Sequence, residues 1–275
     1  DYNGSLTGYV TFPAGTVDGD TQPVLLAIID DNIIEGDEDV SIQLSNINHA
    51  LLTIVDADAT GTILDNDTTP TTGLSVSDFS INESTASANF VVTYNGKNVQ
   101  NGFTANYTIS NGTAISGTDY NAVLTGQITF PDGTTNGSTQ SVNVSLIDDV
   151  LIEENEDLNF DLSNLSTTLI NLVDPSAVGT IVDNDSNSAS VGLTVADITV
   201  DESIGTTNFV VTYNGNQVQD AFTIDYNISD GTANSGIDYS GAPTLSGQVT
   251  FPAGTLDGDQ QNVSINILED TVIEN

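Results

Sequence analysis

A long internal repeat limits the folds that this chain can adopt. An Asp-Tyr pair starts at residues 1, 119 and 238, and the motif TFPxGT starts at residues 11, 129 and 250. The period is therefore 118 to 121 residues. That length is too great for one turn of a solenoid and is typical of a string of sandwich domains.

The repeat divides the chain into three units of unequal completeness. Residues 1–67 are the C-terminal part of a first repeat, residues 73–185 form a complete repeat, and residues 192–275 are the N-terminal part of a third. The short polar connectors read TTPTT and SNSASV. We expect the chain to be a piece of a longer array. We also expect the two incomplete units to be less stable, because half a sandwich exposes an apolar face and sheet edges.

Within the complete unit the apolar residues alternate with polar ones. Val142, Val144 and Leu146 form one such series, and Leu158 and Phe160 belong to another. This period of two is typical of half-buried strands, and Asn-Gly pairs between the series mark tight turns. About seven strands fit into the unit, and no long segment has helical periodicity. The sequence predicts an all-β fold of tandem Ig-like antiparallel β-sandwich domains of about seven strands each.

The charge of the chain excludes several classes of partner. With 39 acidic residues, one Lys and no Arg, the formal net charge is −38. Nucleic acids and anionic membrane surfaces attract clustered Lys and Arg, so neither is an expected partner. No apolar run is long enough for a membrane span, and we expect no direct membrane insertion. Because 37% of the residues are hydrophobic, the chain has enough apolar surface to fold.

The acidic residues are candidate metal ligands where they recur at the same positions. The stretch IDDxxIExxED occurs at residues 29–39 and 147–157, and it keeps its acids while positions 154 and 155 vary. We interpret it as a loop that follows a strand and holds a cation. The triplet DGD at residues 18–20 becomes NGS at residues 136–138, which indicates an ordinary turn with Gly at its centre.

The ligand types favour calcium over other ions. Carboxylate oxygens at irregular spacing suit calcium, which takes six to eight oxygen ligands in flexible geometry. Zinc and copper are disfavoured because the chain has no Cys and His49 is its single His. The absence of Cys also excludes disulfides within the chain.

Five motifs in order carry a resemblance to a known family. They are INES, GTxxxGxDY, TFPxGT, IDDxxIExxED and TIxDND. In this combination the chain resembles the Calx-β domain, which is named for the calcium-binding modules of sodium–calcium exchangers and also occurs in large bacterial surface proteins. The resemblance covers the whole middle unit and what is present of the other two.

The resemblance implies a set of calcium ligands in each unit. In the middle unit they are Glu83, Asp119, Asp148, Asp149, Glu153, Glu156, Asp183 and Asp185. In the first unit they are Asp1, Asp30, Asp31, Glu35, Glu38, Asp65 and Asp67. In the third unit they are Glu202, Asp238, Glu269, Asp270 and Glu274. The chain departs from the family pattern at Asn66 and Asn184, where a third acid is common, and at Glu269, which replaces an Asp.

We expect calcium to neutralise these converging carboxylates, with about three or four ions for the eight acids of the middle unit. Asp183 and Asp185 directly precede the second connector. An ion bound there would clamp the last strand to the acidic loop and stiffen the junction with the next unit.

These features favour a calcium-stiffened stalk or adhesive filament in a secreted or cell-surface protein, most simply on a bacterial outer surface. Long adhesins of gliding Bacteroidota, exported by the type IX system, are similar in style. The expected partners are calcium, neighbouring repeats of the same chain, and a surface or protein ligand that the sequence does not identify. Two alternatives stay open: a calcium-sensing regulatory module like those of sodium–calcium exchangers, and a cadherin-like adhesion rod.

We do not expect an enzyme. Glu35 and Glu38 could serve as a carboxylate pair, but the same pair recurs as Glu153 and Glu156. Such duplication is more typical of structural metal sites than of active sites. The near absence of His, Lys, Arg and Cys also removes most nucleophile–base pairs and phosphate clamps.

Overall fold

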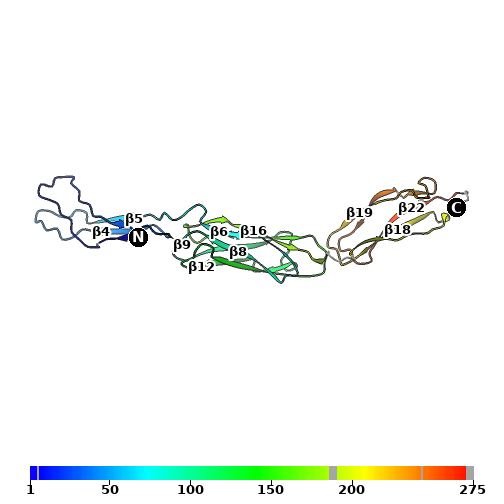
Figure 1. Cartoon of the computed structure of the whole chain (residues 1–275), viewed down its shortest axis with the longest axis horizontal. Helices are drawn as coiled ribbons and strands as arrows, with labels where there is room; N and C mark the ends of the chain where they lie inside the picture. The colour runs from blue at the N-terminus through cyan, green and yellow to red at the C-terminus, as the bar shows by residue number, and fades with distance from the viewer. Residues whose placement is uncertain (5, 186–190, 243, 271–275) are drawn as a thin grey trace.

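The structure is a computed structural model of residues 1–275, and it describes all of them except residues 5, 186–190, 243 and 271–275. Strands in three successive groups follow one another along an elongated molecule (Figure 1). No helix in the described part of the chain is long and apolar enough to cross a membrane.

The middle unit is a sandwich of two five-stranded sheets. The first sheet has the order β12 (Thr125–Phe130), β10 (Phe103–Asn111), β14 (Glu156–Ser163), β16 (Ser176–Val182) and β7 (Phe79–Asn82). The second has the order β11 (Tyr120–Ala122), β13 (Thr139–Leu146), β8 (Ser87–Asn95), β6 (Gly73–Ser77) and β15 (Asn171–Asp174). Seven of these strands have five or more residues. The all-β sandwich predicted from the alternating sequence is confirmed.

The topology differs from a purely antiparallel sandwich at one edge of each sheet. β7 pairs in parallel with β16, and β15 pairs in parallel with β6. The N-terminal segment of the unit is therefore split, with β6 in one sheet and β7 in the other. This split brings the residue after β7 beside the end of β16, where the acidic residues gather.

The core of the middle unit consists of the apolar residues that alternate along the strands. Phe90, Phe103, Phe130 and Phe160 are fully buried. The ring of Phe160 lies 4.8 Å from that of Phe90 and 5.5 Å from that of Tyr107, measured between centroids. Aromatic pairs at such distances contribute about 0.5–1.5 kcal/mol beyond the burial of their area. The interior positions predicted for β13 and β14 are all buried, and so are the alternating apolar positions of β10.

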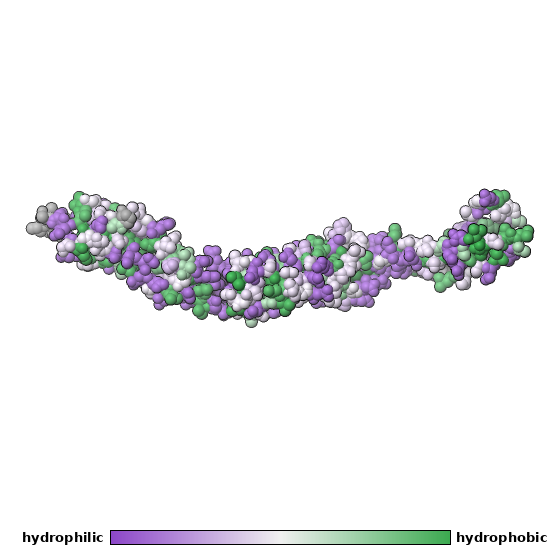
Figure 2. Space-filling view, turned by 180° about the vertical axis from the view of Figure 1, so that it is seen from behind, coloured by the Kyte–Doolittle hydropathy of each residue, from purple (hydrophilic) through white to green (hydrophobic). Residues whose placement is uncertain are grey.

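The two end units are less complete. The first contains two separate ladders of its own strands, β1 (Tyr2–Asn3) with β2 (Ala27–Ile28) and β4 (Glu38–Gln43) with β5 (Asp58–Ile63), in its described residues. The third has a four-stranded sheet of β17 (Gly192–Val195), β18 (Thr206–Asn214), β22 (Gln260–Ile267) and β20 (Tyr239–Gly241). Its β19 (Phe222–Asn227) pairs with β21 (Ser246–Phe251), and a single 3-10 turn, η2, covers Glu202–Ile204. Apolar side chains reach the surface at both ends of the molecule (Figure 2).

Backbone contacts join each unit to the next. β3 (Ile33–Ile34) of the first unit pairs in parallel with β9 (Asn98–Val99) of the middle unit. A parallel bridge between Ile152 and Val218 joins the middle unit to the third. The acidic loop of each unit thus touches the following unit directly.

The turn predicted at residues 18–20 is confirmed. Gly19 and Gly137 have φ angles of 88° and 83°, in the left-handed region that glycine enters without strain. The Oδ2 atom of Asp20 accepts the N–H of Val17 at 2.9 Å, so this acid closes its own turn.

Candidate metal centre

The acidic residues of the middle unit gather at the end where β13 passes into β14. β13 ends at Leu146, and Asp148, Asp149 and Glu153 lie in the loop that follows. The prediction that all these acids lie on the loop is wrong for Glu156, which is the first residue of β14 and pairs with Ile181 of β16. The same holds for Glu38, which begins β4. Strand pairing continues further than the sequence suggested because β16 supplies a partner at this position.

Three carboxylates form what we call the Asp119 cluster. Asp119, Glu153 and Glu156 each offer an oxygen within 4.8 Å of the other two. Asp119 directly precedes β11, and its Oδ2 accepts the N–H of Ile115 at 2.6 Å. This local hydrogen bond fixes the carboxylate in place beside the loop.

A second group, the Glu83 cluster, lies where β7 and β16 end side by side. Glu83, Asp183 and Asp185 also have ligand oxygens within 4.8 Å of one another. The N–H of Glu83 donates to the carbonyl of Val182 at 3.1 Å, which continues the parallel pairing by one residue. Glu83 is only 5% exposed, so the strand pairing holds its carboxyl group in the interior.

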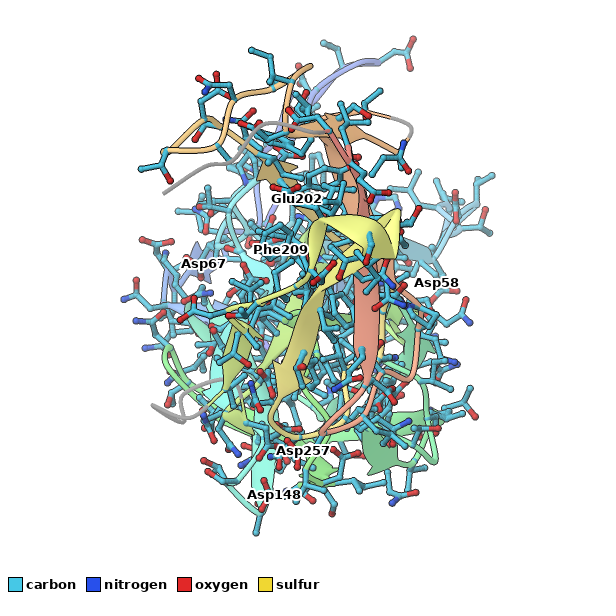
Figure 3. All side chains as sticks on the ribbon, turned by 90° about the vertical axis from the view of Figure 1, so that its right-hand side faces the viewer. Asp58, Asp67, Asp148, Glu202, Phe209 and Asp257 are labelled. Carbon is cyan, nitrogen blue, oxygen red and sulfur yellow. The ribbon has the colours of Figure 1, made fainter. Side chains whose placement is uncertain are left out.

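Asp148 and Asp149 lie beside the clusters without belonging to either. The Oδ1 of Asp149 accepts the N–H of Leu151 at 2.7 Å, and the Oδ1 of Asp148 accepts the side-chain amide of Asn184 at 3.5 Å. Asp148 lies at the lower periphery of the view along the long axis (Figure 3).

The crowding of carboxylates perturbs their protonation. The pKa of Glu83 rises to about 7 because the group is buried and because Asp183, Asp149 and Asp185 repel its charge. Burial also raises the pKa of Glu153 and of Glu156 to about 7, with further contributions from neighbouring acids, including Asp119. These groups therefore stay protonated to higher pH unless a cation balances the charge of the ionised carboxylates.

Two buried oxygens have no protein donor. Among the described residues, Oδ1 of Asn184 and Oδ2 of Asp185 are buried without a hydrogen-bond partner. Buried acceptors are nearly always satisfied, so such atoms require an explanation. Both belong to the segment that forms the Glu83 cluster. A set of oxygen ligands with unsatisfied acceptors fits a hard divalent cation. The side-chain oxygen of Asn184 is one of these acceptors, so it can take the place of the acid that is common in the family at this position.

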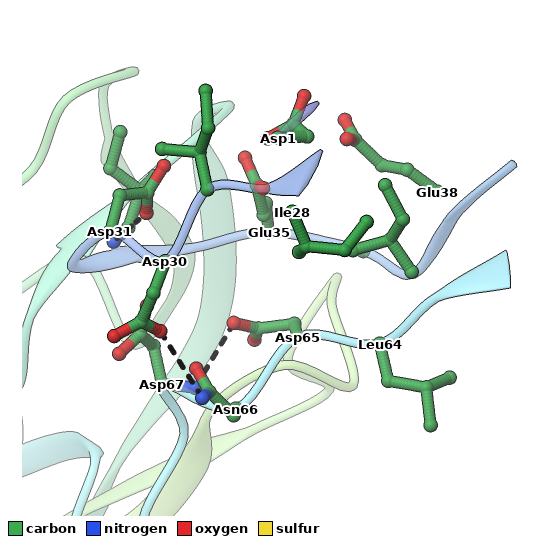
Figure 4. Close-up of a pocket in the computed structure, with 14 residues that line it drawn as sticks. Asp1, Ile28, Asp30, Asp31, Glu35, Glu38, Leu64, Asp65, Asn66 and Asp67 are labelled. Carbon is green, nitrogen blue, oxygen red and sulfur yellow. Dashed lines mark hydrogen bonds between the residues drawn. The ribbon is translucent and has the colours of Figure 1, made fainter. Parts of the chain in front are cut away.

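The first unit repeats the Asp119 cluster with equivalent residues. Asp1, Glu35 and Glu38 have ligand oxygens within 4.8 Å of one another, and each lies 118 residues before its counterpart. Burial raises the pKa of Glu35, with added repulsion from Glu38, Asp31 and Asp65. The remaining predicted acids of this unit line the same cavity (Figure 4): Asp30, Asp31, Asp65 and Asp67.

The backbone around this cavity also repeats that of the middle unit. The side-chain amide of Asn66 donates to Oδ1 of Asp30 at 3.3 Å, as that of Asn184 donates to Asp148. The N–H of Asp67 donates to Oδ1 of Asp65 at 3.0 Å, and Asp185 donates to Asp183 at the same distance. The segment that follows β5 in the first unit therefore makes the same hydrogen bonds as the segment that follows β16 in the middle unit.

In the third unit the predicted acids stay apart. Glu202 begins the exposed turn η2, and Oδ2 of Asp238 accepts the N–H of Asn234 at 2.6 Å. Glu269 and Asp270 follow β22, and Glu274 lies outside the described residues. No cluster of three ligands forms among the described residues of this unit, since β22 is the last strand described and no counterparts of β14 and β16 follow it in the described part.

One charged residue beside the acidic site has no place in the sequence-based prediction. Lys97, the single basic side chain besides His49, pairs with Asp67 across the boundary between the first and middle units. Lys97 could have been singled out from the sequence, because it is the one Lys in a chain with 39 acidic residues and no Arg, and any of those acids could pair with it.

Comparison with known proteins accounts for the repeat. The Calx-beta domain model matches residues 1–67, 65–187 and 183–275. The crystal structure of the apo-form Calx CBD1 domain is 26% identical, has a TM-score of 0.36, and covers 41% of this chain and 96% of its own. The calcium binding domain CBD12 of CALX1.1 is 23% identical with a TM-score of 0.37, and covers 72% of this chain and 76% of its own. No curated protein matches the chain. Because the family model matches the chain from end to end, this chain belongs to the Calx-β domain family as a tandem series of its domains.

Proposed function

We propose that the chain is a calcium-binding repeat segment of a long extracellular or cell-surface protein and acts as a calcium-stiffened stalk or adhesive filament. The observation that carries the proposal is the pair of unsatisfied buried oxygens, on Asn184 and Asp185, beside a cluster of carboxylates. In the middle unit the Glu83 and Asp119 clusters would hold calcium, with Asp148 and Asp149 beside them.

The position of the clusters supports a mechanical role. Asp183 and Asp185 end one unit, and the acidic loop before them contacts the next unit through Ile152. An ion that joins this loop to the end of β16 would therefore restrain both the exit of the chain and the surface on which the next unit rests. The same layout at Asp65, Asp67 and Ile34 gives the array a repeated joint.

The repetition also supports a binding role over catalysis. The carboxylates of the Asp119 cluster recur in the first unit, at Asp1, Glu35 and Glu38. A stalk needs one such site in each unit, whereas an active site needs no such copies. Repetition without Cys is consistent with a bacterial surface array, in which calcium replaces disulfides as the stabiliser. The outer surface of a bacterium, as in adhesins of the gliding type, is the location we propose.

A pair of adjacent acids tests the calcium site. Glu153 belongs to the Asp119 cluster, whereas its exposed neighbour Glu154 belongs to neither cluster. Glu153→Gln and Glu154→Gln remove the same charge. Calorimetric titration with calcium should show at least about tenfold weaker binding for Glu153→Gln, which corresponds to about 1.4 kcal/mol, and unchanged binding for Glu154→Gln. Equal affinities in the two variants, or no calcium binding by the chain itself, would refute the proposed site.

A further inference from the structure

The two junctions between units share one backbone arrangement. At the first, the N–H of Gln100 donates to the carbonyl of Ile34 at 2.9 Å, beside the pairing of β3 with β9. At the second, the N–H of Ile152 donates to the carbonyl of Gln217 at 2.8 Å, and the N–H of Gln219 returns a bond to Ile152 at 3.0 Å. The acidic loop of one unit thus docks against the same connecting segment of the next unit at both places. This segment runs from β8 to β10 in the middle unit and from β18 to β19 in the third.

The side chains at the two junctions differ at one equivalent position. The hydroxyl of Tyr94 donates to the carbonyl of Lys97 at 2.6 Å, and that of Tyr213 donates to the carbonyl of Asn216 at 2.6 Å. Lys97 and Asn216 therefore occupy the same place in the connecting segment. Lys97 reaches back to Asp67, the last acid of the preceding unit. Asn216 makes no such pair with Asp185 in the part of the chain that the structure describes, and Oδ2 of Asp185 is left unsatisfied.

The junction that has the ion pair is also the more tightly closed. Asp67 is 4% exposed, and Ile34 and Val99 are buried. Their counterparts Asp185, Ile152 and Val218 are only half-buried. The first junction has a two-residue ladder where the second has an isolated bridge. A buried carboxylate is expensive without a counter-charge, so the ammonium group of Lys97 accounts for the burial of Asp67.

We propose that Lys97 is a built-in cation of the interface between the first and middle units, which holds Asp67 against the next unit without a bound metal ion. This inference rests on the proposed function, because it concerns the stiffness of the stalk. The ion pair would make the first joint of the stalk stiff in the absence of calcium. The second joint has Asn216 at that position and depends on an added divalent cation to engage Asp185. The identity of one residue in the connecting segment thus sets whether a joint responds to calcium.

The test measures distances across each joint in EDTA. The chain has no Cys, so single cysteines can be introduced for spin labels. One labelled pair, Thr60→Cys with Thr129→Cys, spans the first junction, and Thr129→Cys with Thr250→Cys spans the second. All three positions are exposed on strands β5, β12 and β21. In EDTA we expect a narrow distance distribution across the first junction and a broad one across the second.

Exchanging Lys97 and Asn216 should exchange which junction is rigid in EDTA. Lys97→Asn should widen the first distribution about twofold, since the buried carboxylate of Asp67 loses its partner, while Lys97→Arg should keep it narrow. Asn216→Lys should narrow the second distribution without calcium. The third unit already has Asn at this position, so Lys97→Asn is compatible with the fold of the connecting segment.

Two results would overturn the proposal: a first distribution in EDTA that Lys97→Asn leaves unchanged, or a second that Asn216→Lys leaves broad. Neither depends on whether calcium binds, because the measurement is made without it. A chain that binds no calcium would refute the proposed function, and the distance measurements would still test the role of Lys97.

Discussion

The middle unit and the first unit contain the same TFPxGT motif, but its Phe is buried in the middle unit and exposed in the first. In the middle unit Phe130 ends strand β12 and is fully buried against Phe103. In the first unit Phe12 belongs to no strand and is 50% exposed. β12 pairs with β10, and residues 1–67 contain no counterpart of β10. An alternating apolar pattern therefore becomes a buried strand only where its pairing partner and the facing sheet are present.

The acidic clusters behave in the opposite way. Asp1, Glu35 and Glu38 come together in the first unit as Asp119, Glu153 and Glu156 do in the middle one. They depend on short connections: the ladder of β1 with β2 brings Asp1 to the acidic loop, and that of β4 with β5 places Glu38. The ion site therefore needs less of the sandwich than the hydrophobic core does.

The loss of an aromatic ring should change the stability of the middle unit far more than that of the first unit. Phe130→Ala removes a fully buried ring and should destabilise the middle unit by about 3–5 kcal/mol. Phe12→Ala changes a half-exposed ring and should cost less than about 0.5 kcal/mol. Native-state hydrogen exchange of the full chain, followed by mass spectrometry, reads each unit separately. A similar loss for both variants would show that the first unit is as well packed as the middle one.

Calcium should stabilise the middle unit more than either end unit. At a free concentration about 100 times Kd, one site adds about 2.7 kcal/mol to the free energy of unfolding. The middle unit has two clusters, the first unit has one, and the described part of the third has none. Protection against hydrogen exchange in calcium relative to EDTA should fall in that order, and magnesium, which binds such carboxylate cages poorly, is the control. Equal protection of all three units would contradict the assignment.

The pH dependence of the calcium-free middle unit follows from its raised pKa values. Glu83, Glu153 and Glu156 have pKa values of about 7 in the folded unit against 4.5 for the free side chain. The folded state then takes up protons before the unfolded state does as the pH falls through this window. Stability without calcium should increase by about 1–3 kcal/mol from pH 8 to pH 5.5. The destabilisation by these ionised carboxylates is complete above their pKa in the folded state and is absent below their pKa in the unfolded state.

Calcium reverses this dependence, because it binds the ionised groups and displaces their protons. In saturating calcium the same unit should lose stability as the pH falls. Urea unfolding at several pH values, with and without calcium, checks both slopes. If the calcium-free unit became more stable as the pH rose, the repulsion inferred within the clusters would be wrong.

The smallest expected difference concerns the shared turn. Gly137 and Gly19 have nearly the same positive φ, and no atom lies within 4 Å of an added Cβ at either position. Gly137→Ala should destabilise the middle unit by about 1 kcal/mol through backbone strain alone. Gly19→Ala should have a smaller effect, because the turn in the first unit joins no paired strands. Exchange rates of the amides flanking each turn measure the two costs, and a larger loss at Gly19 would reverse the comparison.

Much of the middle unit could be predicted from the sequence. The buried positions along β10, β13 and β14 follow from alternation, and Asp183 and Asp185 follow the end of β16 as expected. The turn at Gly137 follows from the need for a positive φ. The position of Glu156 at the start of β14 could not be predicted, because it depends on the length of β16 opposite it.

The repeat, the alternation of the strands and the recurrence of the acids can be read from the sequence, since these are periodic features that lie along the chain. Other features appear only in the folded chain: the division of the N-terminal segment between β6 and β7, the docking of Ile34 against Val99, and the pairing of Lys97 with Asp67. These contacts join segments from different sheets or different units. Their energies depend on burial and on the distance between charges, and a linear pattern contains neither quantity.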